Sequence, residues 1–279
     1  MNILICGHRA YAARGLAPLL ENAGHKVVCF SRGSEGKDGN IITGDVKSID
    51  RNPFIEWDID VIVNFILLKD GTPQDNIEYI SALCRLAKKH HVAKLIHLSS
   101  ISSYPNDAAV ITDNTEMDHN AMLKGKYGSL KVLVDEYLIR EREMYGLPVI
   151  LLRPGFIASE DHPNPLGGIA KVLPGKIAVL IGNRQSTLPL VYRNEMHQVL
   201  KRIIEKEKVA NVYIAVSKGA CTKAEYAKTI DPKLRVIGIP KGLTIGTAKF
   251  LRFIGIFDDR KLQMVRGMFK TQDVRPSTL

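Results

Sequence analysis

The chain has 279 residues, 45% of them hydrophobic and 24% charged, a balance that is ordinary for a soluble globular protein. This length allows one large α/β domain, or such a domain with an appended lobe, and it can bury a sizeable core. The net charge of +10 suits polyanionic partners, but the basic residues are spread along the chain and form no DNA-binding motif, so the charge favours small phosphorylated ligands over nucleic acid.

The first two-thirds of the chain alternate short apolar runs with helical patterns, which predicts the α/β class: a Rossmann-type, doubly wound parallel sheet covered by helices. The predicted strands are residues 2–6, 26–31, 40–42, 60–66, 94–98 and 149–153. The predicted helices are residues 11–23, 73–91 and 126–145. The last two helices are also candidates for a homodimer interface.

The alternation weakens after residue 155, where a segment rich in Pro and Gly begins. A strand at 188–192 and a helix at about 195–207 are expected to rejoin the sheet, whereas residues 213–216 are assigned to a smaller lobe. We therefore predict a Rossmann domain at 1–157, rejoined by about 186–210, and a smaller C-terminal substrate lobe at 158–185 and 211–279. The stretch 247–257 is basic and apolar, which is typical of a membrane-surface helix, but packing against its own domain is the favoured interpretation.

The N-terminus and the cysteines indicate a cytoplasmic protein. Residues 1–7 are apolar but lack a basic start and a cleavage site, so they predict a buried strand and not a signal peptide. No apolar run approaches the roughly 20 residues of a membrane span, which predicts no integral membrane segment. The cysteines have no CxxC spacing and no nearby histidine in ligand spacing, so they predict buried thiols in a reducing compartment and no metal site; they are Cys6, Cys29, Cys84 and Cys221.

Tyr127 and Lys131 are four residues apart on a predicted helix, so their side chains share one face. A phenol with a pKa of about 10 transfers protons poorly near neutral pH, and a nearby ammonium group lowers that pKa by favouring the phenolate. With a serine hydroxyl hydrogen-bonded to a substrate carbonyl, the tyrosine and lysine could transfer a proton to or from the substrate oxygen as hydride is transferred. Residues 99–104 form a serine-rich stretch that could supply this hydroxyl. The alternative for an isolated YxxxK pattern is a solvated helix face.

Gly7 closes the first strand and begins the turn into the first helix, where a dinucleotide pyrophosphate would lie on helix N–H groups. Alanines stand at the two later glycine positions of the usual fingerprint, and the Cβ of Ala10 narrows the approach to the phosphates. The second strand ends in Ser31-Arg32 where an acidic residue would accept the ribose hydroxyls of NAD. Together with Arg9, Arg32 suits the 2′-phosphate of NADP, so the sequence favours NADP over NAD; two exposed loop arginines are the alternative.

The order of these motifs resembles the extended short-chain dehydrogenase/reductase family, which includes nucleotide-sugar epimerases, dehydratases and ketoreductases. The resemblance covers nearly the whole chain. It is carried by the glycine turn at Gly7, Gly44-Asp45-Val46, residues 60–64, Asn76, residues 97–105, the Tyr127/Lys131 pair and residues 152–155. The wording of the glycine turn and the serine-rich loop is most similar to NADP-dependent reductases of 4-keto-6-deoxy nucleotide sugars.

The resemblance implies an NAD(P)-dependent oxidoreductase or epimerase that acts on a nucleotide-activated sugar by hydride transfer. Tyr127 would be the general acid/base, Lys131 would lower its pKa and bond the nicotinamide ribose, and Ser100 would orient the carbonyl. The implied cofactor-binding residues are Gly7, Arg9, Ala10, Tyr11, Ser31, Arg32, Asp45, Val46, Phe65, Ile66, Tyr127, Lys131, Pro154 and Gly155. The candidate substrate-binding residues are Ser102, His162, Arg184 and Arg193.

Three of these assignments have an alternative. Asp45 is a candidate acceptor for the adenine amine, or a local cap. His162 is a candidate second acid/base, or a solvated loop histidine. Arg184 and Arg193 are candidates for the substrate's phosphates, or ordinary surface arginines. The alternative for the whole chain is a non-catalytic NADP-binding sensor or scaffold protein of the same fold, motivated by the altered glycine turn.

Overall fold

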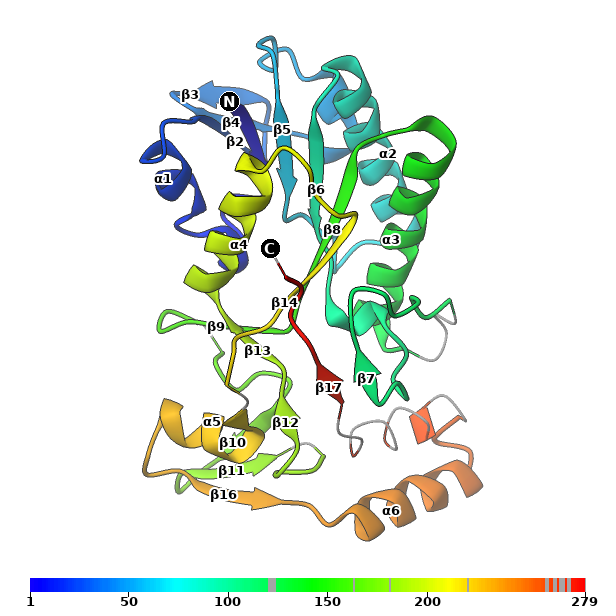
Figure 1. The fold of residues 1–279 in the computed structure, drawn as a ribbon. Coiled ribbons are helices and arrows are strands. Elements are labelled where there is room, and N and C mark those ends of the chain that lie inside the picture. Colours follow the sequence, from blue (N-terminus) through cyan, green and yellow to red (C-terminus); the bar gives the residue numbers. More distant parts are fainter. Residues whose placement is uncertain are drawn as a thin grey trace.

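The computed structural model describes residues 1–119, 124–162, 164–180, 182–219, 221–258, 261, 262, 265, 269 and 272–278. Its centre is an eight-stranded sheet in the order β14-β8-β6-β5-β1-β2-β4-β3 (Figure 1). The strands are β1 (Asn2–Cys6), β2 (Lys26–Arg32), β3 (Gly36–Asp38), β4 (Ile41–Gly44), β5 (Val61–Asn64), β6 (Lys94–Leu98), β8 (Val149–Pro154) and β14 (Val212–Ala215). All neighbours are parallel except β3, which runs antiparallel to β4. The predicted α/β class and doubly wound sheet are confirmed.

Helices cover both faces of the sheet, which is why its strands are nearly continuous apolar runs. The helices α2 (Pro73–Lys89) and α3 (Lys126–Tyr145) bury Tyr79 and Leu138 against one face. On the other face α1 (Leu16–Glu21) and α4 (Arg193–Glu205) bury Leu20 and Met196. The helix expected from about residue 195 is thus present as α4, packed on the sheet.

The first predicted helix is wrong as one continuous element. Residues Tyr11–Ala13 form a 3₁₀ turn, η1, and α1 begins only at Leu16, because Gly15 takes φ 90° between them. This left-handed conformation is open to glycine and interrupts a helix. The break leaves η1 free to face the carboxyl end of the sheet.

Lys94 joins the start of β6 to the end of α4. Its buried ammonium group donates to the carbonyls of Ile203 (3.0 Å), Ile204 (2.7 Å) and Lys206. The last carbonyls of a helix have no partner within the helix and carry partial negative charge, so a cation stabilises them there. This contact fixes α4 against the sheet.

Most of the smaller elements gather at one end of the molecule, whereas η2 (Val46–Arg51) packs against α2 beside the main sheet (Figure 1). The others are η3 (Ile101–Ser103), β7 (Val110–Ile111), β9 (Phe156–Ala158), β10 (Ala170–Leu173), β11 (Ile177–Leu180), β12 (Thr187–Leu188), β13 (Leu190–Tyr192), β15 (Cys221–Thr222), α5 (Lys223–Ile230), β16 (Arg235–Gly238), α6 (Lys241–Phe253) and β17 (Asp273–Val274). β10, β11 and β16 form a three-stranded sheet, while β12–β15, β9–β13 and β7–β17 are pairs.

Two expectations for this half of the chain need correction. Residues 212–215 belong to the main sheet as β14, beside β8, and not to the smaller lobe. The predicted strand 188–192 is divided between β12 and β13, and β13 pairs with β9 instead of joining the main sheet. Both depend on pairing between segments far apart in sequence, which no local pattern specifies. The wider division into two lobes stays a prediction.

Helix α6 does not pack as the sequence favoured. Ala248 is its buried residue, whereas Phe250 is 60% exposed and Phe253 is 88% exposed. Among the helices of the described residues, none is both long enough and apolar enough to cross a bilayer.

Candidate active site

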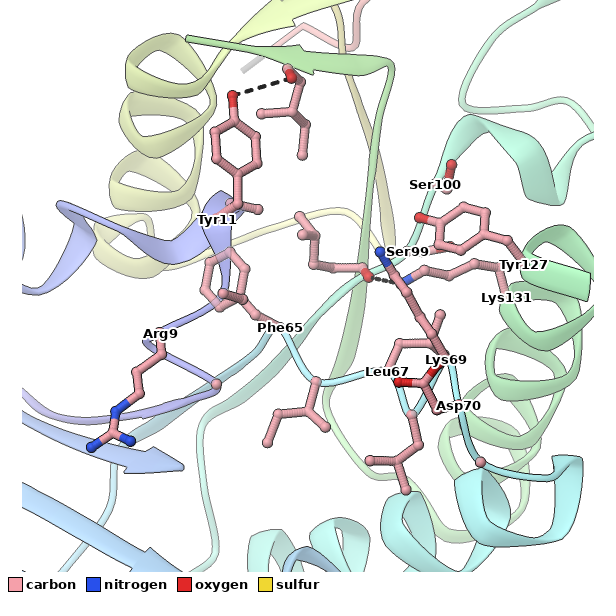
Figure 2. A pocket seen from close by; sticks show the side chains of 18 of the residues that line it. Arg9, Tyr11, Phe65, Leu67, Lys69, Asp70, Ser99, Ser100, Tyr127 and Lys131 are labelled. Atoms are coloured by element: carbon pink, nitrogen blue, oxygen red, sulfur yellow. Dashed lines mark hydrogen bonds between the residues drawn. The ribbon is translucent and has the colours of Figure 1, made fainter. Parts of the chain in front are cut away.

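A cavity of about 1150 Å³ opens at the carboxyl ends of the central strands, where β1 gives way to η1 and β6 to η3. This edge is where ligands bind in open parallel sheets. Every residue that the sequence assigns to the cofactor lines this one cavity, and so do Ser100 and His162. Figure 2 shows Ser100, Tyr127 and Lys131 together on one side, with Tyr11 and Arg9 across the cavity from them.

The turn at Gly7 requires glycine. Its φ is +81°, and an added Cβ would lie 2.7 Å from Cγ1 of Ile66 and 3.3 Å from the Ile66 nitrogen. The backbone of Gly7 can therefore pass close to the loop that follows β5. Ala10 has an extended conformation, and its N–H donates to the Gly7 carbonyl at 2.8 Å. The turn is therefore tight, and it lies at the edge of the sheet where ligands bind in open parallel sheets.

Ser31 supports the fit of a dinucleotide in this cavity. The residue is 5% exposed, it lines the cavity, and its Oγ has no hydrogen-bond partner among the described residues. A buried hydroxyl normally has a partner, so a ligand hydroxyl or phosphate oxygen here would satisfy it. Arg9 and Arg32 are exposed at the same rim. Asp45 accepts the Lys47 N–H at 3.1 Å and caps η2, so the alternative of a local cap holds while the residue also lines the cavity.

Tyr127 and Ser100 meet at the cavity wall. Their side chains lie near each other, and Tyr127 remains 44% exposed, which leaves it accessible to a ligand. Surrounding protein atoms raise the pKa of Tyr127, and the nearby Ser100 hydroxyl only partly opposes this. The expected lowering of this pKa by Lys131 is therefore wrong for the protein alone. Lys131 Nζ turns to the Leu98 carbonyl and lies 5.9 Å from the centre of the tyrosine ring.

Lys131 is buried, and burial lowers the pKa of its ammonium group to about 8. Asp135 opposes this shift, whereas Lys69 reinforces it. Lys69, which sequence reasoning missed, also lines the cavity and lies 5.5 Å from the centre of the Tyr127 ring. The position of Lys69 in the sequence could have suggested this, because the residue lies in the short loop after a buried strand, at the edge of the sheet where ligands bind.

A buried ion pair supports this wall from behind. Asp135 is fully buried and accepts hydrogen bonds from Ser99 Oγ (2.6 Å) and from Arg153 Nη2 (3.0 Å) and Nε (3.2 Å). The guanidinium group of Arg153 also lies 4.6 Å from the centre of the Tyr104 ring. Sequence reasoning missed this network, although an arginine inside an apolar strand needs a buried partner and Asp135 lies one turn after Lys131.

Three predicted substrate residues lie outside the cavity lining. Ser102 is held next to Ser100, whose Oγ accepts its N–H at 3.1 Å. Arg193 is bound to Asp161 at 2.8 Å and to the Tyr11 carbonyl at 3.3 Å. The stem of Arg184 lies beside Gly238 of β16. Ser102 therefore lies beside the Tyr127 wall without lining the cavity, whereas the contacts of Arg184 and Arg193 are with other elements.

His162 does line the cavity. Its ring centre is 4.2 Å from that of Tyr11, its Nδ1 accepts the Asn164 N–H at 2.9 Å, and burial lowers its pKa. Both the packing and the pKa favour a neutral imidazole. No group of three His, Cys, Asp or Glu side chains in the described part of the chain is arranged to hold a metal ion.

The family is identified by comparison with known proteins. The model of the NAD dependent epimerase/dehydratase family matches residues 3–215. The chain belongs to this family. The resemblance predicted from the sequence motifs is thus confirmed. Membership of this family supports an NAD-dependent enzyme of the epimerase/dehydratase class. No curated protein shows significant similarity to the chain.

Solved structures share the fold at low identity. L-threonine dehydrogenase from Phytophthora infestans is 19% identical with a TM-score of 0.71, covering 99% of this chain and 90% of that one. UDP-glucose 4-epimerase from Thermotoga maritima, with UDP-glucose, is 18% identical with a TM-score of 0.68 over 86% of both chains. dTDP-glucose 4,6-dehydratase from Bacillus anthracis, in complex with NAD, is 19% identical with a TM-score of 0.66 over 86% of this chain and 85% of that one. At these identities the likeness establishes the fold.

Proposed function

We propose that this chain is an NAD(P)-dependent oxidoreductase or epimerase that acts on a nucleotide-activated sugar, by 4-keto reduction or epimerisation. The observation that carries the proposal is the presence of Ser100, Tyr127 and Lys131 in the same cavity as the Gly7 turn and the unpartnered Ser31 hydroxyl. This arrangement puts a proton donor and a dinucleotide-binding turn within one ligand-sized space. The solved UDP-glucose 4-epimerase and dTDP-glucose 4,6-dehydratase support the choice of a nucleotide sugar.

In this proposal a bound nicotinamide would exchange a hydride with the sugar carbon. Ser100 holds the carbonyl oxygen by donating its hydroxyl proton, and the Tyr127 phenol gives that oxygen a proton in the reductive direction. Tyr127 starts from a raised pKa, so it holds its proton until the substrate is in place. Lys131 and Lys69 supply the positive charge that stabilises the phenolate formed. His162, as a neutral imidazole at the cavity wall, is the candidate second base for an epimerisation.

We propose that NADP is preferred to NAD. Ser31 and Arg32 end β2 where an acidic side chain would select NAD, and Arg9 lies on the same rim. Arginine recognises a phosphate through paired hydrogen bonds and retains its charge at all relevant pH values. Replacement of Arg32 by Glu is expected to weaken NADPH binding and leave NADH binding nearly unchanged, measured by titration of intrinsic fluorescence.

Tyr127→Phe is the test of catalysis. The variant removes one hydroxyl from a half-exposed ring, so it is expected to fold, to bind NADPH, and to lose at least about 100-fold in turnover of keto-sugar nucleotides. Tyr145→Phe, at the exposed end of the same helix, is the matched control and is expected to keep full activity. Full activity in Tyr127→Phe would refute the mechanism. Tight NADPH binding by the unmodified protein without hydride exchange on any nucleotide sugar would instead favour a non-catalytic sensor or scaffold.

A further inference from the structure

The outward face of α6 is apolar. Leu243, Phe250 and Phe253 are 65%, 60% and 88% exposed, and their spacing places them on one side of the helix. The apolar surface continues into the turn after the helix, where Ile254 and Ile256 are also exposed. Exposure of two phenylalanine rings to water is less favourable than their burial. Binding of an apolar partner to this face would therefore be favourable.

The position of α6 leaves this face accessible. The helix lies at the end of the molecule farthest from the main sheet, beyond the small β16 sheet (Figure 1). Its inward side is the one that carries the buried Ala248. The cavity at the Gly7 turn is lined by other elements, so the face does not belong to the site already described.

Basic residues predominate around this face. Between residues 232 and 257 the sequence has five basic residues and no Asp or Glu, and Asp231, Asp258 and Asp259 lie just outside this stretch. Lys241 and Lys249 are exposed on α6 itself. A second copy of this chain, which carries the same basic segment and a net charge of +10, would bring like charges together. An anionic surface would instead attract Lys249, which borders the phenylalanines on the helix, and receive the phenylalanines.

We propose that α6 is an interfacial helix that binds the protein to an anionic lipid surface, with Leu243, Phe250 and Phe253 inserted at the boundary between headgroups and acyl chains. A helix of 13 residues is about 20 Å long, shorter than the roughly 30 Å hydrocarbon core, so it lies on the bilayer and does not cross it. Lysine side chains beside an apolar face extend to the headgroups, which is the pattern of such helices. The inference is independent of the reaction assigned to the cavity.

Sedimentation with vesicles tests this inference. The full-length protein is mixed with vesicles of phosphatidylcholine alone, or of phosphatidylcholine with phosphatidylglycerol, at physiological ionic strength. We expect binding to the anionic vesicles only, weakened by added salt. Phe250→Ser/Phe253→Ser is expected to lower the partition at least about ten-fold, because it removes most of the inserted apolar area. The control Met144→Ser/Tyr145→Ser alters two side chains of similar exposure on α3 and is expected to bind as the unmodified protein does.

Each other result would overturn the proposal. Absence of binding to anionic vesicles would refute it, and so would equal binding by Phe250→Ser/Phe253→Ser. Equal binding to neutral and anionic vesicles would refute the role of the lysines. If light scattering shows the unmodified protein to be a dimer and Phe250→Ser/Phe253→Ser to be a monomer, the face is a subunit contact and the lipid assignment is wrong. Circular dichroism of the variants establishes that they are folded.

Discussion

The ion pair behind the Tyr127 wall gives the sharpest prediction for stability. Asp135→Asn keeps the size of the side chain but removes the charge that balances Arg153, which is 2% exposed. Three hydrogen bonds to Asp135 Oδ2 are weakened at once, two of them from the guanidinium group. Removing one partner of a buried pair costs about 3–5 kcal/mol, because the other charge stays in the interior without compensation. In a chain of this size each kcal/mol of lost stability lowers Tm by about 2–4 °C, so we expect a fall in Tm of roughly 6–20 °C.

Urea unfolding followed by circular dichroism measures this loss. Asp273→Asn is the matched control, since its ion pair with Arg275 has both side chains more than half exposed, and it is expected to change stability by no more than about 1 kcal/mol. A loss below about 1 kcal/mol in Asp135→Asn would refute the reasoning, because it would mean that Arg153 is solvated or finds another partner. A second variant, Asp135→Asn/Arg153→Met, separates the two causes: it is expected to recover part of the loss by removing the unpaired cation.

Three further changes have defined outcomes. Lys131→Met is expected to stabilise the protein by about 3 kcal/mol at pH 7, because a buried lysine with a pKa of about 8 is charged at this pH and burial of that charge is unfavourable. The folded state releases this proton at a lower pH than the unfolded state does, so the unmodified protein gains stability as the pH rises from about 8 to 10.5. The stability advantage of the variant, measured by urea unfolding at each pH, is therefore expected to shrink over that range. Gly155→Ala is expected to lose about 3 kcal/mol or more in the same assay, because its Cβ would lie 2.1 Å from the Pro189 carbonyl oxygen, whereas Gly246→Ala, with open space around it on α6, is expected to be neutral or slightly stabilising. Lys94→Met is expected to cost about 1–3 kcal/mol and to speed hydrogen exchange at the end of α4, since three carbonyls lose their donor.

Most of the central sheet could be predicted because its strands are short, buried and separated by helical patterns. β1 and β6 were predicted to the residue, and so was α3. Elements whose identity depends on distant partners could not be predicted in place. Residues 212–215 are apolar enough to read as a strand, yet only their register with β8 makes them the edge of the main sheet. The break at Gly15 is local, but a lone glycine does not say whether a helix tolerates it or ends there.

The candidate site divides in the same way. The residues placed by motif order, such as Gly7, Ser100 and Tyr127, line one cavity, because parallel strands deliver their following loops to the same edge. The electrostatics of the cavity depend on contacts across the fold. The surrounding protein raises the pKa of Tyr127, and Lys131 does not offset this shift. The four-residue spacing of the two side chains could not predict the direction of this shift. The roles of the site residues are still predictions that the variants above test.

The buried charges beneath Tyr127 leave an excess of positive charge. Lys131 and Arg153 share the single negative charge of Asp135, and Lys69 adds a further cation at the cavity wall. Burial of this excess is unfavourable, which is why the pKa of Lys131 falls to about 8. An anionic ligand that enters the cavity offsets the cost, so it raises the pKa of Lys131 as it binds and holds the lysine charged. In the protein alone Asp135 adds to the raised pKa of Tyr127, so the phenol holds its proton at neutral pH.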